Sequence, residues 1–304
     1  MSSSEFSKKI EIQNTHLRLE KDLILNDSSR IKFDEVLAKV KFHKKIYIDW
    51  NFASVDPTGR AVILNFYGPP GTGKTMAADA LAGTLSMSII KVGIADIESK
   101  FMGETAKNIS SLFEKAAATA SVLFFDEADT LLGKRLSSVT QGVDNEVNSM
   151  RSTMLVELEK FDGIVVFATN FIKNYDSAFH SRISHSIEFS LPDFLGRKAI
   201  FDRFLIDQIP INSTRQEFLE LAAQVSEGFS GREIRNCMRL ALPKCLIEAS
   251  ENGLEPVLNI QHCINAAEEI NAAKKNYVSS HKTAISKENA DDFKKLLNIE
   301  TIQE

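Results

Sequence analysis

Residues 68–75 combine three glycines with an adjacent lysine and threonine, a combination that can bind phosphate. They match the pattern G-x-x-x-x-G-K-[ST] at every fixed position. In order, the residues are Gly68, Pro69, Pro70, Gly71, Thr72, Gly73, Lys74 and Thr75. Glycines let the backbone curl so that its N–H groups and the start of a helix face an anion. We expect this loop to bind ATP, with Lys74 facing the β- and γ-phosphates and the Thr75 hydroxyl serving as a ligand of Mg²⁺.

Two adjacent carboxylates, Asp126 and Glu127, follow an apolar stretch about fifty residues after this loop. At the end of a buried strand, Asp126 would hold Mg²⁺ through its water shell. Glu127, one residue further out, is placed to polarise an attacking water as a general base. The pair therefore predicts the second half of a nucleoside triphosphate hydrolysis site.

The elements that must position these residues alternate between strands and helices. A buried strand over 61–67 and a helix from residue 76 flank the phosphate loop. The stretch over 121–125 is apolar throughout, which is typical of a central strand in a parallel sheet. Further strands are expected over 88–92, 164–168 and 186–189, and further helices over 29–45, 105–118 and 150–159. The stretch from Ser137 to Asn148 is polar and is expected to be a loop, and residues 1–28 alternate weakly like a frayed strand.

After Leu191-Pro192-Asp193 the pattern is only helical. Helices are expected over 194–206, 214–226, 232–250, 260–275 and 287–297. The fold class is therefore α/β: a phosphate-loop sandwich with a parallel sheet, followed by a small α-helical lid domain. We expect three parts: a short N-terminal segment (1–50), a nucleotide-binding domain (51–192) and the lid (193–304).

Composition limits which partners and which cellular location we expect for the protein. The net charge of −5 argues against wholesale binding of nucleic acid or anionic membranes. The three cysteines have no C-x-x-C spacing, and no apolar run reaches the roughly 18 residues of a membrane span. The opening residues lack the apolar segment of a secretory signal. A cytoplasmic protein that does not associate with membranes is expected.

Together these motifs resemble the AAA+ ATPases, in the AAA branch of hexameric protein remodellers, over about 185 residues from Ala61 to Cys245. The resemblance implies that Asn170 orients water against the γ-phosphate. It also implies that Arg182 is an arginine finger that reaches the nucleotide of a neighbouring subunit. Many members carry two or three arginines in this turn, whereas this chain has His180 and Ser181 before Arg182.

The resemblance also covers a pore loop and a second sensor. Lys100, Phe101 and Met102 resemble the loop that lines the central channel of the hexamer and grips a polypeptide. Arg232, in Gly228-Phe-Ser-Gly-Arg232, resembles a sensor arginine that contacts phosphate from the lid. These features imply a homohexamer that acts on a protein client.

A narrower resemblance rests on the Ser-Gly-Arg sensor and the Lys-aromatic pore loop. Both are similar to those of the pachytene-checkpoint remodellers, which act on HORMA-domain proteins and have bacterial relatives in antiphage signalling. Two other readings stay open: a nucleic-acid motor or loader, and an unfoldase that serves a separate protease. The chain itself has no H-E-x-x-H zinc protease motif.

Overall fold

The computed structural model describes residues 10–56, 61–97, 104–133, 142–170 and 176–276. The chain divides into two compact units, Met1–Pro192 and Asp193–Glu304, and each is described by itself. In the part of the chain that the structure describes, no helix is both long and apolar enough to span a bilayer.

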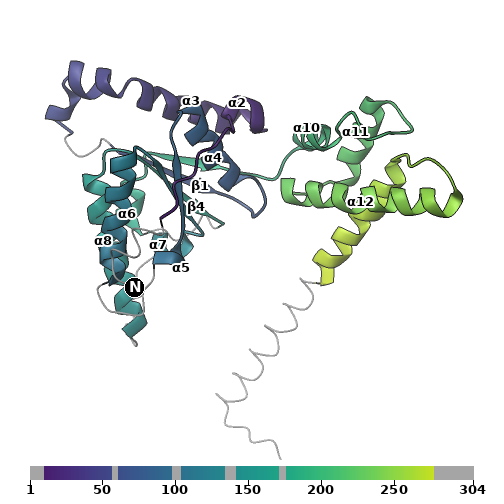
Figure 1. The fold of residues 1–304 in the computed structure, drawn as a ribbon. Helices are drawn as coiled ribbons and strands as arrows, with labels where there is room; N and C mark the ends of the chain where they lie inside the picture. The colour runs from purple at the N-terminus through teal and green to yellow at the C-terminus, as the bar shows by residue number, and fades with distance from the viewer. Residues whose placement is uncertain (1–9, 57–60, 98–103, 134–141, 171–175, 277–304) are drawn as a thin grey trace, which may run out of the picture. The chain divides into compact units, whose positions relative to one another are not determined.

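The first unit is built on a five-stranded sheet with the order β2-β3-β4-β1-β5, and all of its strand pairs are parallel. The neighbouring strands β1 and β4 are labelled in Figure 1. The strands are β1 (Val62–Tyr67), β2 (Ile89–Gly93), β3 (Val122–Asp126), β4 (Ile164–Thr169) and β5 (His185–Glu188). Every residue of β4 is buried, as expected for a strand covered on both faces. The expected strands are thus confirmed, with ends that differ by one residue.

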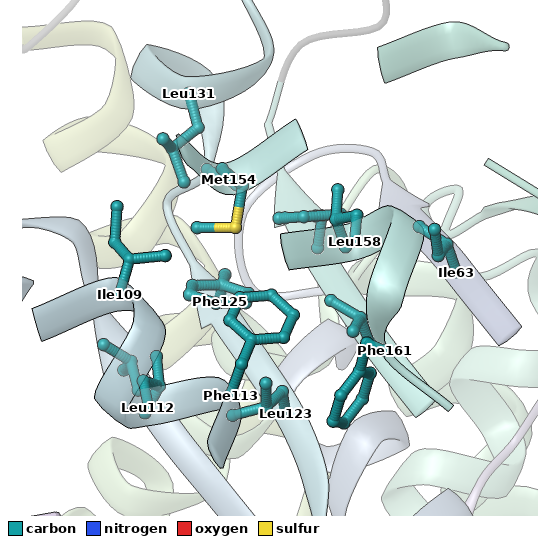
Figure 2. Close-up of a cluster of buried hydrophobic side chains, with 14 of the residues drawn as sticks. Ile63, Ile109, Leu112, Phe113, Leu123, Phe125, Leu131, Met154, Leu158 and Phe161 are labelled. Carbon is teal, nitrogen blue, oxygen red and sulfur yellow. The ribbon is translucent and has the colours of Figure 1, made fainter. Parts of the chain in front are cut away.

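Alternate side chains of each strand enter two different apolar layers. Figure 2 shows one layer, in which Leu123 and Phe125 of β3 pack against α6 (Glu104–Thr119) and α8 (Gly142–Lys160). Phe113 of α6 meets Phe161 edge to face, with ring centroids 5.2 Å apart. α6 and α8 therefore cover one face of the sheet.

The opposite layer contains α4 (Lys74–Thr84) and much of the N-terminal segment. Leu19 of α2 (Leu19–Asp22) and Phe33 of α3 (Asp27–Lys41) are buried in it. The ring centroids of Phe33 and Phe66 lie 5.5 Å apart. The N-terminal segment thus contributes to the core of the first unit.

Two expectations for local structure were wrong. Residues 10–28 form no regular strand: Gln13 makes a single antiparallel bridge to Ile89, and α2 follows. The polar stretch before Met150 is not a loop throughout, because α8 begins at Gly142. A helix can begin with a polar stretch, so polarity alone did not separate helix from loop there.

In the described residues of this unit, the other short elements are two helical turns and three short helices. They are η1 (Lys45–Asp49, a π-helical turn), η2 (Phe52–Ser54), α5 (Ile94–Ile97), α7 (Asp129–Leu132) and α9 (Ser177–His180).

The second unit is helical in all of its longer elements. It contains α10 (Phe194–Phe204), α11 (Arg215–Val225), α12 (Gly231–Asn252) and a helix over 260–276. The Asp193 side chain caps α10 by accepting a hydrogen bond from the Gly196 N–H at 2.7 Å, which explains why a helix begins after Pro192. Four expected helices are confirmed to within two residues at each end, and the fifth, over 287–297, lies outside the described residues.

Candidate nucleotide-binding site

The loop before α4 has the backbone that its glycines make possible. Gly68, Gly71 and Gly73 all have positive φ, of 141°, 78° and 102°. A Cβ at Gly68 would lie 2.2 Å from the carbonyl oxygen of Phe189, which follows β5. The loop is therefore pressed against the end of the sheet, and only glycine fits at its first position.

Lys74, the first residue of α4, is buried and points its amine back into the loop. Its Nζ donates to the carbonyl oxygens of Gly68 and Pro69 at 2.7 and 3.0 Å. It also donates to Oδ1 of Asn170 at 2.9 Å. The lysine charge thus sits between the loop and the residue that follows β4, where it can face an anion bound by the loop.

Thr75 and Asp126 come together from different elements. The Thr75 hydroxyl donates to Oδ2 of Asp126 over 3.3 Å. A hydroxyl and a single carboxylate fit Mg²⁺, which keeps several waters and takes its remaining ligands from phosphates. In the described residues no group of three or more His, Cys, Asp or Glu side chains could hold a metal by itself. The donor set therefore fits a magnesium ion that arrives with a nucleotide.

Glu127 has a left-handed backbone with a φ of 52°, which costs a non-glycine residue about 1–2 kcal/mol. The turn is held from both sides: the Glu127 N–H donates to Oδ1 of Asp126 at 2.9 Å, and the Ala128 N–H donates to the carbonyl oxygen of Ala168 at 2.9 Å. The Glu127 side chain is exposed. Backbone strain held in this way is typical of a functional position.

The residues that end the strands meet at one edge of the sheet. Gly93 is paired with Asp126, and Tyr67 with Thr169, so the carboxyl ends of β2 and β3, and those of β1 and β4, are level. Open parallel sheets bind ligands at this edge. The structure thus brings together five predicted site residues: Lys74, Thr75, Asp126, Glu127 and Asn170.

Two contacts were not predicted from the sequence, one at this edge and one before the starts of β4 and β5, at the opposite edge of the sheet. The Thr169 hydroxyl donates to Oδ1 of Asp129, which ties the end of β4 to the first residue of α7. The Arg182 guanidinium forms an ion pair with Glu159 and donates to the carbonyl oxygen of Ala178 at 2.7 Å. Glu159 lies 23 residues before Arg182 in the chain, and no motif joins the two.

The other predicted residues belong to the second unit or to segments outside the described residues. Arg232 is exposed in the first turn of α12 in the second unit. There Ser230 caps the helix and forms a reciprocal capping box with Glu233. Lys100, Phe101 and Met102 lie outside the described residues.

Comparisons with known proteins agree with this geometry. The model of the ATPase family associated with various cellular activities (AAA) matches residues 64–191. The chain is 36% identical over 221 residues to a proteasome-activating nucleotidase of Saccharolobus islandicus, covering 70% of this chain and 54% of the relative. It is 34% identical over 178 residues to the 26S proteasome subunit RPT4 of Saccharomyces cerevisiae, covering 56% of this chain and 40% of that subunit.

The chain thus spans about half the length of the curated relatives that it matches. A solved structure, the FIGL-1 AAA domain in complex with ADP, shares the fold with a TM-score of 0.66 and 20% identity, covering 92% of this chain and 96% of that one. Together with the loop and carboxylate geometry, these matches place the domain formed by residues 64–191 in the AAA family of ATPases.

Proposed function

We propose that this chain binds Mg-ATP at the edge of its sheet, hydrolyses it, and uses the energy to pull on a client protein. The proposal rests on three hydrogen bonds at this edge. Lys74 donates to Asn170, Thr75 donates to Asp126, and the Glu127 N–H donates to Asp126. Each side chain has the chemistry that a distinct part of phosphoryl transfer needs.

The roles follow from position. Lys74 exchanges its loop carbonyl partners for phosphate oxygens and neutralises their charge. Thr75 and Asp126 hold Mg²⁺, which when bound neutralises charge on the phosphates. Glu127 takes a proton from the attacking water. Asn170, released from Lys74, orients that water.

Assembly into a homohexamer is part of the proposal, because Arg182 is assigned to the nucleotide of a neighbouring subunit. In the isolated chain its guanidinium is held by Glu159 and Ala178. A finger that arrives from a neighbour makes hydrolysis depend on assembly. Arg232 is assigned a phosphate-sensing role in cis, on the basis of its sequence context alone.

The client is a protein, and Phe101 with Lys100 and Met102 grips it. The relatives named above support this class, since one activates a proteasome and the other is a proteasome subunit. Those names also favour a second candidate function, in which the chain unfolds proteins for a separate protease. A HORMA-domain client is the finer proposal, and it rests on the Ser230-Gly231-Arg232 sensor and the Lys100-Phe101 pair.

The experiment compares Phe101→Ala with Lys74→Ala and the unchanged protein. ATP hydrolysis and client unfolding are measured side by side, with two clients: a HORMA-domain protein and a folded fluorescent reporter that carries an unstructured tail. Phe101→Ala should hydrolyse ATP normally but fail to unfold its client, because an aromatic ring supplies much of the gripping contact. Lys74→Ala should fail in both assays.

The outcomes separate the candidates. Unfolding of the HORMA-domain protein alone supports the finer proposal, whereas unfolding of the tailed reporter supports a general unfoldase that serves a protease. Normal client processing by Phe101→Ala would overturn the pore mechanism. Stimulation of ATP hydrolysis by DNA, with a steep salt dependence, would instead support a nucleic-acid motor.

A further inference from the structure

The first turn of α12, which carries Arg232, is joined by an ion pair to another helix of the second unit. The amine of Lys274 lies 2.6 Å from Oε1 of Glu233, the residue after Arg232. Lys274 belongs to the helix over 260–276, so the ion pair connects two helices that are separate in the sequence. The proposed function assigns no role to this lysine.

Both oxygens of the Glu233 carboxylate have partners. Oε2 accepts hydrogen bonds from the Ser230 N–H at 2.7 Å and from the Ser230 hydroxyl at 2.9 Å. Oε1 is the atom that faces Lys274. A capping box by itself satisfies only groups at the start of its own helix. Here the same carboxylate also binds a second helix, so Lys274 holds the capping box in place.

Lys274 also contacts the residue that precedes the capping box. Its amine lies 4.8 Å from the centre of the Phe229 ring, a distance at which a cation is attracted to an aromatic face. Phe229 is buried in the apolar core of the second unit. In the sequence, Phe229 and Glu233 lie on either side of Arg232. Lys274 therefore contacts the chain both before and after this arginine.

The Arg232 side chain itself is exposed, whereas Ser230 is buried and Glu233 exposes only 23% of its side chain. The backbone that carries Arg232 is thus held while its guanidinium stays accessible to a ligand. The ends of helices fray readily. A contact made from a turn that is already held loses less conformational entropy than one made from a frayed turn.

We propose that Lys274 is a positioning residue for Arg232, because it fixes the first turn of α12 from which Arg232 contacts phosphate. The inference rests on the phosphate-sensing role of Arg232 in the proposed function, and it adds a residue that acts through that arginine. Lys274 itself does not touch the nucleotide. Its effect is modest, because it exposes 42% of its side chain and exposed ion pairs are weak.

The affinity of the full chain for ATP tests the proposal. All proteins carry Glu127→Gln to slow hydrolysis, and calorimetry with Mg²⁺ present measures the dissociation constant. Arg232→Ala should weaken ATP binding by about tenfold or more, the usual effect of losing a hydrogen bond to a charged group. Lys274→Met should weaken it by about two- to fivefold, the range for a partly exposed ion pair.

A double-mutant cycle separates positioning from general support of the fold. Lys274→Met should weaken ATP binding when Arg232 is present and should have no further effect in Arg232→Ala. A lysine that only stabilises the second unit would lower the melting temperature in both backgrounds without this dependence of ATP affinity on Arg232. An equal loss of ATP affinity in both backgrounds would overturn the positioning role.

Glu233→Gln tests the route through the capping box with a second variant. Its amide oxygen can still accept hydrogen bonds from Ser230, but the charge that faces Lys274 is removed. This variant should weaken ATP binding about as much as Lys274→Met, and combining the two should add nothing. Additive losses would show that Lys274 does not act through Glu233 and would overturn the proposal.

Two further variants are matched controls. Lys275→Met removes the neighbouring exposed lysine and should leave ATP affinity unchanged. Lys274→Arg keeps the positive charge and should bind ATP as the unchanged side chain does. If Lys274→Met binds ATP as tightly as Lys275→Met while Arg232→Ala binds it weakly, the proposal is overturned and the proposed function stands. If Arg232→Ala leaves ATP affinity unchanged, the phosphate-sensing role of Arg232 is wrong, and the proposal fails with it.

Discussion

The amine of Lys74 donates a hydrogen bond to Oδ1 of Asn170 at 2.9 Å and so joins the phosphate loop to the end of β4. The same amine is held by two carbonyl oxygens of the loop. In the proposed function, phosphate oxygens replace these acceptors, and binding of ATP would therefore release the Asn170 side chain from Lys74.

Lys74→Ala should abolish ATP binding, because it removes the buried charge that faces the phosphates. Isothermal titration calorimetry measures this directly. Lys91→Ala is a matched control, since Lys91 lies in the same unit but pairs with Asp79 at 2.8 Å. ATP affinity that is unchanged in Lys74→Ala would remove the assignment of this loop.

Glu127→Gln should keep ATP bound while slowing hydrolysis by about 10²–10⁴-fold, the usual contribution of a general base. The amide keeps the shape of the side chain and loses its basicity. Single-turnover hydrolysis of bound ATP is the measurement, with Glu157→Gln, whose carboxylate accepts from Ser110 at 2.7 Å, as the control. Normal turnover in Glu127→Gln would assign the base elsewhere.

Arg182→Ala should leave ATP binding intact and lower hydrolysis by about 10³–10⁵-fold, as expected for an arginine finger. Mixing it with Lys74→Ala protein tests whether the finger acts on a neighbour. Some interfaces of a mixed ring pair an intact loop with an intact finger, so activity should return. If mixed rings form and stay inactive, Arg182 acts within its own subunit or supports structure through Glu159.

Gly68→Ala should destabilise the first unit more than Gly73→Ala, although both glycines have positive φ. An added Cβ meets the Phe189 carbonyl oxygen at 2.2 Å in the first case and nothing within 4 Å in the second. Overpacking of this kind costs about 1–3 kcal/mol, which corresponds to a difference in melting temperature of about 3–10 °C. Calorimetry of both variants measures it, and equal melting temperatures would contradict the close contact.

Acidification should loosen the start of α12 through Glu233. Burial raises the pKa of this carboxyl, but hydrogen bonds from Lys274 and Ser230 outweigh burial and hold the pKa below its ordinary value of 4.5. A lowered pKa in the folded state stabilises the protein above pH 4.5, and this stabilisation is lost as the pH falls through the lowered value. Below pH 4.5, the melting temperature should therefore fall less steeply with decreasing pH in Glu233→Gln than in the unchanged chain. Equal slopes for the two proteins would show that Glu233 does not contribute to the acid sensitivity.

The sequence predicted the sheet because its strands are short, apolar and separated by helical periodicity. It predicted the phosphate loop and the Asp126-Glu127 pair because phosphate binding needs particular residue types at fixed spacings in the chain. It did not predict the contact of Arg182 with Glu159, because two surface residues on separate elements leave no pattern in the chain. Nor did it predict that Trp50 is exposed, since the sequence pattern of an apolar residue does not show whether the residue is buried.

The position of β1 in the sheet determines when this strand can pair during synthesis of the chain. β1 lies between β4 and β5: Val62 pairs with Ile164, and Leu64 with His185. The apolar β1 therefore leaves the ribosome long before either neighbour has been translated. Folding driven by such distant pairings is slow, and an unpaired apolar strand is open to aggregation until they form. A fragment that ends before β4 therefore leaves β1 without either of its neighbours in the sheet.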